Sequence, residues 1–177
     1  MSTGEREHGH EARVPEAVDA WRAVAARRGY EGRVPLAAFE RLKGLLLDAQ
    51  GEVAWRLQFD RDSLQVPYVE LQLEAELPLQ CQRSLNRFLL PVRIGQRLGL
   101  IRDEADEAGL PPDYEALLVP EDGQLQLLDI VEDELVLAVP PVPVAPGSEA
   151  VERDWPAQEE ELAKANPFAA LASLKKN

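Results

Sequence analysis

The sequence contains one cysteine and no long apolar run, and each of these absences excludes a class of protein. Because Cys81 is the only cysteine among 177 residues, no intramolecular disulfide can form. No apolar run approaches the roughly 20 residues that cross a bilayer. Residues 1–13 are polar and carry no signal-peptide core. We therefore expect a cytoplasmic protein that has no membrane partner.

Histidine is also scarce, which leaves little material for a metal site or a catalytic base. A structural zinc ion usually has four ligands, and only His8 and His10 could join Cys81. Both histidines lie in residues 1–13, which we predict to be disordered. Ser84 stands where a Cys-x-x-Cys pair would need its second thiol, so we interpret Cys81 as a small buried hydrophobe. The sequence predicts no metal, no cofactor, no catalytic residue and no small-molecule substrate.

The net charge of −13 is distributed unevenly along the chain. Residues 1–98 hold 14 acidic and 14 basic side chains, whereas residues 99–162 hold 18 acids and only two arginines. Residues 163–177 hold three lysines and no acid. Because the overall acidity repels nucleic acid at long range, contact with RNA would need a local basic patch or a protein partner.

Two segments near the N-terminus show helical spacing. Over residues 14–28 the apolar side chains recur every three to four positions, Pro15 suits the first turn, and Gly29 suits a left-handed end. This pattern predicts an amphipathic helix. A second, shorter helix is predicted from Pro35 to Lys43.

From residue 52 the apolar period changes from helical spacing to strict alternation, which is typical of strands with one buried and one solvated face. The strand candidates are residues 53–59, 69–79, 88–94 and 114–119. Pro91 indicates an edge or a bulge in the third candidate. One-sided strands favour antiparallel pairing. The predicted fold class is α+β, with N-terminal helices against an antiparallel β-sheet or partly closed barrel built from residues 52–120.

A further helix is predicted over residues 125–135, followed by a proline-rich stop at residues 140–146. We expect the α+β domain to cover residues 14–144. Four carboxylates of the helix are interpreted as its solvated outer face rather than as an acid–base or metal pair. They are Asp129, Glu132, Asp133 and Glu134.

The end of the chain differs in composition from the predicted domain. Residues 145–165 are acidic and polar, which predicts a flexible linker. Residues 166–177 are predicted to form a C-terminal docking helix with Phe168, Leu171 and Leu174 on one side. The alternative is that this tail folds back on its own domain.

Arginines gather in the one long stretch without acids, between Glu76 and Asp103. The tentative contacts for RNA or a partner are Arg83, Arg87, Arg93 and Arg97, with Arg102 as a fifth arginine. Guanidinium groups close to an aromatic residue suit phosphate contact and base stacking. The alternative is that these arginines neutralise the acidic half of the same protein.

Three stretches of the sequence are distinctive, namely residues 77–84, 127–144 and 166–176. Together they resemble the YceD family, the large ribosomal RNA subunit accumulation proteins. LPLQCQRS at residues 77–84 is similar to the family's Leu-x-Cys-x-Arg-Cys segment, although Ser84 replaces the second cysteine. LLDIVEDELVLAVPPVPV at residues 127–144 and NPFAALASLKK at residues 166–176 are similar to more specific family segments. The likeness covers most of residues 14–177, and the missing cysteine argues against a metal or thiol role.

The resemblance implies a non-enzymatic ribosome biogenesis factor that supports the synthesis, processing or accumulation of 23S rRNA. The implied partners are ribosomal RNA or a large-subunit ribosomal protein. The alternative function is an acidic protein-binding adaptor or chaperone for a basic large-subunit ribosomal protein, without direct RNA contact. The residues by themselves indicate only an acidic adaptor with a docking tail.

Overall fold

The computed structural model describes residues 14–148 of the chain. The predictions for residues 1–13, for most of the 145–165 linker and for the 166–177 helix with its three apolar residues lie outside the described residues. The chain divides into two units, and the architecture described below is that of the first, Met1–Ala145.

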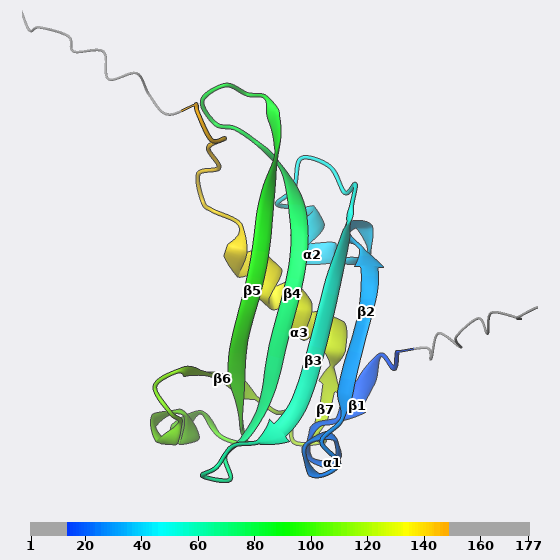
Figure 1. Cartoon of the computed structure of the whole chain (residues 1–177), viewed down its shortest axis with the longest axis vertical. Helices are drawn as coiled ribbons and strands as arrows, with labels where there is room; N and C mark the ends of the chain where they lie inside the picture. The colour runs from blue at the N-terminus through cyan, green and yellow to red at the C-terminus, as the bar shows by residue number, and fades with distance from the viewer. Residues whose placement is uncertain (1–13, 149–177) are drawn as a thin grey trace, which may run out of the picture. The chain divides into compact units, whose positions relative to one another are not determined.

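Five strands form one sheet in the order β2-β3-β4-β5-β6 (Figure 1). They are β2 (Gly29–Pro35), β3 (Glu52–Arg61), β4 (Pro67–Gln80), β5 (Arg87–Ile101) and β6 (Tyr114–Leu118). The first four strands pair antiparallel, and β6 pairs parallel with β5. A separate two-stranded antiparallel sheet joins β1 (Ala17–Asp19) to β7 (Gln124–Gln126).

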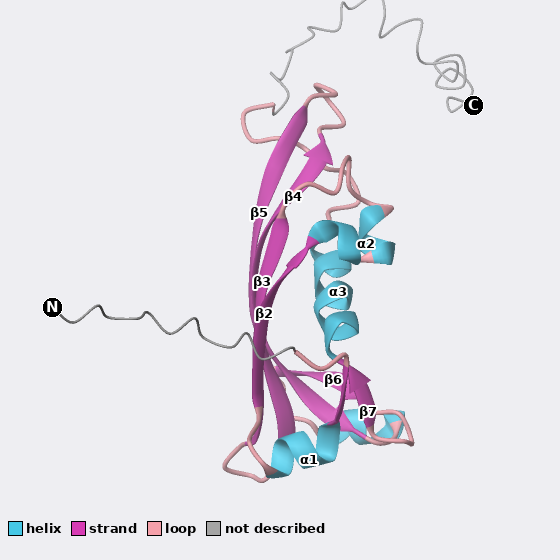
Figure 2. Cartoon of the chain, turned by 90° about the vertical axis from the view of Figure 1, so that its right-hand side faces the viewer, coloured by secondary structure: helices cyan, strands magenta, loops and turns pink. Residues whose placement is uncertain are grey.

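Three α-helices and two 3₁₀ turns complete the described part of the chain. They are α1 (Ala20–Ala25), η1 (Leu36–Ala38), α2 (Glu40–Lys43), η2 (Glu104–Gly109) and α3 (Leu127–Ala138). Figure 2 shows α2 and α3 together on one face of the five-stranded sheet, with α1 at the end of the sheet. Within residues 14–148, no helix covers the opposite face.

Strict alternation in the central strands explains this one-sided arrangement. In β4 every second residue from Val69 to Leu79 is buried, and the residues from Val53 to Phe59 in β3 follow the same rule. The apolar side of α3 joins them in one core. The predicted α+β class with a largely antiparallel sheet is therefore confirmed, and the sheet is open rather than closed into a barrel.

The predicted helix over residues 14–28 is wrong in extent. Ala17–Asp19 pairs with β7 as a strand, and the Asp19 side chain accepts a hydrogen bond from the N–H of Arg22 at 2.9 Å, which caps a helix of only six residues. Arg27, with φ of 48°, turns the chain after α1, and Gly29 begins β2 instead of ending the helix.

Three other elements also differ from the sequence prediction. The helix predicted over residues 125–135 begins only at Leu127 and ends at Ala138, because residues 124–126 form β7. The second predicted helix divides into a 3₁₀ turn and the four-residue α2. The predicted strand 88–94 extends over Arg87–Ile101. Pro91 is tolerated inside this strand because β6 pairs only with its last five residues, so Pro91 lies where that side of β5 has no neighbouring strand.

The prediction that Glu132 faces solvent is wrong. Its side chain is only 6 % exposed, and Oε1 accepts hydrogen bonds from the N–H groups of Arg41 at 2.7 Å and Leu42 at 3.1 Å. Those N–H groups open α2, whose N-cap Phe39 supplies no side-chain cap, so Glu132 caps the helix from a distant element. The Arg41 guanidinium also pairs with Glu132, at 3.0 Å.

The other three carboxylates of α3 do not share one environment. Asp129 and Asp133 are exposed as predicted, and Asp133 is a second ion-pair partner of Arg41. Glu134, by contrast, is 9 % exposed, so its predicted place on the outer face is also wrong. The pattern misleads because α3 packs against both α2 and the sheet, and two of its glutamates lie in these contacts.

Replacing Glu132 by Ala is expected to lower the free energy of unfolding by about 2 kcal/mol, since two N–H groups of α2 lose their acceptor. Urea denaturation measures this difference. Asp133→Ala is the matched control, because it removes only the exposed partner of Arg41 and should have a much smaller effect. Equal losses in the two variants would contradict the capping role.

The contribution of Glu132 is also expected to depend on pH. Burial acts to raise the pKa of Glu132, but hydrogen bonds from the N–H groups of Leu42 and Arg41 and from the Arg41 guanidinium outweigh burial and hold the pKa below its usual value. The stabilisation is therefore complete above the unfolded pKa of about 4.3, and it is lost as pH falls through the lower folded value.

The measurement is the difference in unfolding free energy between the natural protein and Glu132→Gln, followed from neutral pH down to about pH 3. This difference should shrink as the pH falls below about 4, where the natural side chain also becomes neutral. The control, Asp133→Asn, should show a small difference throughout. A Glu132→Gln difference that stays constant or grows toward acid pH would contradict the account.

Candidate functional site

The uncovered face of the sheet carries polar side chains in rows that follow the strand pairing. Residues directly opposite each other in an antiparallel pair point to the same face, so each row crosses four strands. One row contains Glu31, Arg56, Gln72 and Gly95. The next row contains Arg33, Ala54, Glu74 and Arg93. Together the two rows line a depression of about 830 Å³.

The arginines around this depression pair with neighbouring glutamates. Arg93 lies 3.0 Å from Glu74, and Arg33 lies 2.7 Å from Glu52, with every side chain more than half exposed. Exposed ion pairs of this kind contribute little to stability because water screens them. The guanidinium groups therefore remain accessible to an anionic ligand that replaces the carboxylate.

Three of the four predicted contact arginines lie on this same face. Arg87, Arg93 and Arg97 are separated by even numbers of residues along β5, and all three are exposed. At about 3.3 Å per residue, they extend along about 33 Å of strand rather than forming a compact cluster. Arg83 lies beyond them, exposed in the turn between β4 and β5.

Arg97 lies over two aromatic rings on this face, in the part of β5 that pairs with β6. Its guanidinium carbon is 5.1 Å from the ring centre of Tyr68 and 6.0 Å from that of Tyr114. The Tyr114 hydroxyl donates a hydrogen bond to Asp62 at 3.1 Å, and burial followed by this bond raises the pKa of Tyr114. The result is a fixed group of planar side chains, which suits stacking on a base.

Arg87 is held more firmly than Arg93. Its Nε and Nη2 donate to the two carboxylate oxygens of Asp48 at 2.7 and 3.3 Å, which ties the loop before β3 to β5. The Arg87 guanidinium, followed by the N–H of Gln50, holds the pKa of Asp48 below its usual range. The alternative interpretation was that these arginines neutralise the acidic half of the protein, residues 99–162. Asp48, which pairs with Arg87, and Glu74, which pairs with Arg93, both lie outside that segment.

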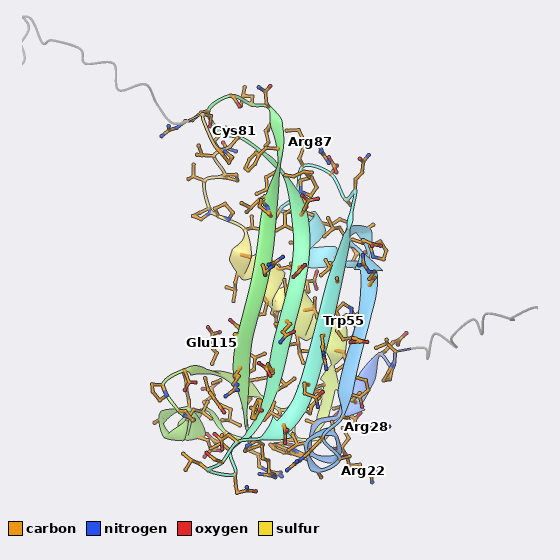
Figure 3. The ribbon with its side chains drawn as sticks, in the orientation of Figure 1. Arg22, Arg28, Trp55, Cys81, Arg87 and Glu115 are labelled. Carbon is orange, nitrogen blue, oxygen red and sulfur yellow. The ribbon has the colours of Figure 1, made fainter. Side chains whose placement is uncertain are left out.

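The turn between β4 and β5 is fixed by Cys81, which is fully buried. The Cys81 sulfur accepts hydrogen bonds from the N–H groups of Ser84 and Ala145 at 3.5 and 3.4 Å, and the N–H of Gln82 donates to Pro143 at 2.9 Å. Figure 3 shows Cys81 and Arg87 at this end, with Arg22 and Arg28 at the opposite end of the sheet near α1. The buried thiol therefore positions the turn that carries Arg83.

Arg102 does not join the other predicted arginines. Its guanidinium carbon lies 4.1 Å from the ring centre of Trp21 in α1, at the far end of the sheet. Sequence reasoning also missed Arg33 and Arg56. The alternation in residues 53–59 could have placed Arg56 outward, but Arg33 lies in β2, a strand that the sequence did not predict.

The described residues hold neither a cluster of metal ligands nor a membrane-spanning helix. In residues 14–148, no group of three or more His, Cys, Asp or Glu side chains could hold a metal ion, and His8 and His10 lie outside this range. None of the helices in the described part of the chain is long and apolar enough to cross a membrane.

Comparison with known proteins identifies relatives with one shared description. A family model described as "Large ribosomal RNA subunit accumulation protein YceD" matches residues 69–175. The protein of that name from Haemophilus influenzae is 30 % identical over 170 residues, which cover 92 % of this chain and 97 % of that protein. No solved structure matches the chain. The family match begins in β4 and includes the β4–β5 turn, all of β5 and α3.

If the outward arginines are available for a ligand rather than required for folding, Arg93→Gln should lower the melting temperature by less than about 2 °C. Arg87→Gln is the matched comparison and should lower it further, because Arg87 joins two elements through Asp48. Thermal unfolding followed by circular dichroism measures both. A larger fall for Arg93→Gln than for Arg87→Gln would contradict this division.

Proposed function

The chain belongs to the YceD family, and from this premise we propose that it supports the accumulation of large-subunit 23S ribosomal RNA in the cytoplasm by binding rather than by catalysis. The printed descriptions of the family and of the Haemophilus relative support the link to this RNA. The single observation that carries the binding mode is the uncovered sheet face, along which β5 aligns exposed arginines.

We propose that RNA phosphates contact Arg83, Arg87, Arg93 and Arg97. An RNA backbone that follows β5 would meet them in turn, since three lie on one strand face and Arg83 lies in the turn at its start. A phosphate can take the place of Glu74 on Arg93 because that ion pair is exposed and therefore weak. Bidentate guanidinium–phosphate pairing would favour this exchange.

An unpaired base provides a second kind of contact on the same face. Arg97 presents its guanidinium plane beside Tyr68 and Tyr114, and single-stranded bases stack on such groups. The net charge of −13 opposes RNA at long range, so the expected complex depends on these local contacts and is weakened by salt.

The RNA proposal predicts a specific salt response. Replacing all four arginines by Gln should weaken binding to a 23S rRNA fragment, and it should reduce the slope of log K against log salt by about 3, because up to four phosphates are no longer neutralised. Fluorescence anisotropy at several salt concentrations measures both quantities.

The matched control removes four positive charges away from the proposed contacts, at α1 and the loop after it, at α2 and just after β5. Its four replacements are Arg22→Gln, Arg28→Gln, Lys43→Gln and Arg102→Gln, all at exposed positions. The control should leave the slope nearly unchanged if RNA contacts the proposed face. An equal reduction in both quadruple variants would assign the effect to net charge, and an unchanged slope in the first would remove these arginines from the RNA interface.

A second candidate function is favoured by the charge of the C-terminal half. Residues 99–148 contain twelve acidic side chains and a single arginine, Arg102. Such a surface attracts a basic protein, as expected of an adaptor or chaperone for a basic large-subunit ribosomal protein. We propose that residues 166–177 dock on the partner in this case, through Phe168, Leu171 and Leu174.

A further inference from the structure

A groove of about 370 Å³ lies between α3 and β6, and its lining combines apolar with acidic side chains. The apolar members include Leu117, Val136 and Leu137, and the acidic members are Glu115, Asp133 and Glu134. No lysine or arginine of the described residues lines it. Figure 3 shows Glu115 beside β6, on the side of the molecule away from Arg22 and Arg28.

Glu134 is a buried carboxylate in this groove without a cationic partner among the described residues. Its side chain is 9 % exposed, and its neighbours are Glu115 and the Gln96 amide, whose Nε2 also donates to Glu115 at 3.4 Å. Burial and then the charge of Glu115 raise the pKa of Glu134, while the hydrogen bond from Gln96 opposes the rise. A buried charge in such surroundings is unfavourable until a cation reaches it.

Glu132, two residues earlier on the same helix, has the cationic partner that Glu134 lacks among the described residues. Glu132 is buried to a similar degree, but Arg41 and two N–H groups surround it. The same chain therefore supplies one buried glutamate of α3 with a cation and leaves the other with an amide and a second carboxylate. A lysine or arginine from another molecule would complete the second site as Arg41 completes the first.

Because apolar side chains also lie at the edge of the groove, a ligand needs apolar groups as well as positive charge. Leu137 is 74 % exposed at the end of α3, and Val136 and Leu117 line the groove beside it. An exposed leucine beside an apolar groove is typical of surfaces that bind an amphipathic segment. The ligand that fits has basic groups for the carboxylates and apolar groups for Leu137 and its neighbours.

We infer that the groove between α3 and β6 binds a lysine- or arginine-rich protein segment that also carries apolar side chains. The inference rests on the second proposed function and gives its binding site. Nucleic acid does not fit, because its phosphates would meet the groove's three carboxylates within a surface of strongly negative charge. The groove lies on the helix-covered side of the sheet, opposite the proposed RNA face.

The test uses the full chain and a labelled synthetic peptide of lysine and leucine, with the leucines three and four residues apart on one helical face. Fluorescence anisotropy at about 0.15 M salt should show binding, and a scrambled peptide of the same composition should bind several-fold more weakly. Glu115→Gln with Glu134→Gln should weaken the helical peptide by more than about tenfold.

Two matched controls separate the groove from the general acidity of the surface. Glu104→Gln with Glu107→Gln removes the same charge from exposed positions in η2 and should reduce binding by less than about threefold. Leu137→Ser should weaken binding, whereas Leu64→Ser, at a leucine 77 % exposed in the β3–β4 turn, should leave it unchanged. Both leucines are exposed, so neither replacement disturbs the core.

Several results would overturn the inference. Equal losses in both double variants, or equal affinity for the scrambled peptide, would leave only non-specific charge attraction. A dimer in sedimentation that Leu137→Ser dissociates would make a second copy the occupant. Peptide binding that appears only after Lys164, Lys175 and Lys176 are replaced by Gln would make the chain's own basic end the occupant.

Nucleic acid is tested as a ligand in the same assay. An rRNA fragment that competes with the peptide and loses affinity in the Glu115 and Glu134 double variant would also overturn the inference. The two proposed functions remain distinguishable, because loss of peptide binding with RNA binding intact contradicts only the groove. Loss of RNA binding in the arginine variants, with peptide binding intact, affects only the RNA interface.

Discussion

Burial of a single face of β4 is the constraint on which the rest of the structure depends. Because alternate residues from Val69 to Leu79 are apolar, the sheet has one side that must be covered, and α3 and α2 cover it. The other side is then left to Glu, Gln and Arg. The sheet face proposed to bind RNA and the position of α3, which is proposed to bind protein, both follow from the alternation of apolar and polar residues in β4.

Helix α3 links stability to interaction through two glutamates. Glu132 caps α2 and pairs with Arg41, so it fixes the cover of the sheet at that end. Glu134 lies in the α3–β6 groove beside Gln96 and Glu115. The opposite directions of their pKa shifts express this difference, since one carboxylate has a cation beside it and the other has none among residues 14–148. We propose that a cation from the partner completes the site at Glu134.

The sequence predicts those parts of the fold that depend on local pattern. Alternation identified β3 and β4, but β2 was missed because GYEGRVP has little apolar alternation and depends on pairing with β3. The burial of Glu132 was missed because its partner Arg41 lies 91 residues away. Among the candidate residues, the arginine-rich stretch was visible in the sequence, whereas the cross-strand rows that bring in Arg33 and Arg56 required the strand register.

The central proposal is that this YceD-family protein binds large-subunit ribosomal RNA through the uncovered face of its sheet. The most direct measurement is photochemical crosslinking of the full chain to a 23S rRNA fragment, with the crosslinked residues identified by mass spectrometry. The account predicts crosslinks at Tyr68 and Tyr114, which flank Arg97 on that face. Crosslinks confined to Trp21 and the α1 end, with none in β4, β5 or β6, would contradict it.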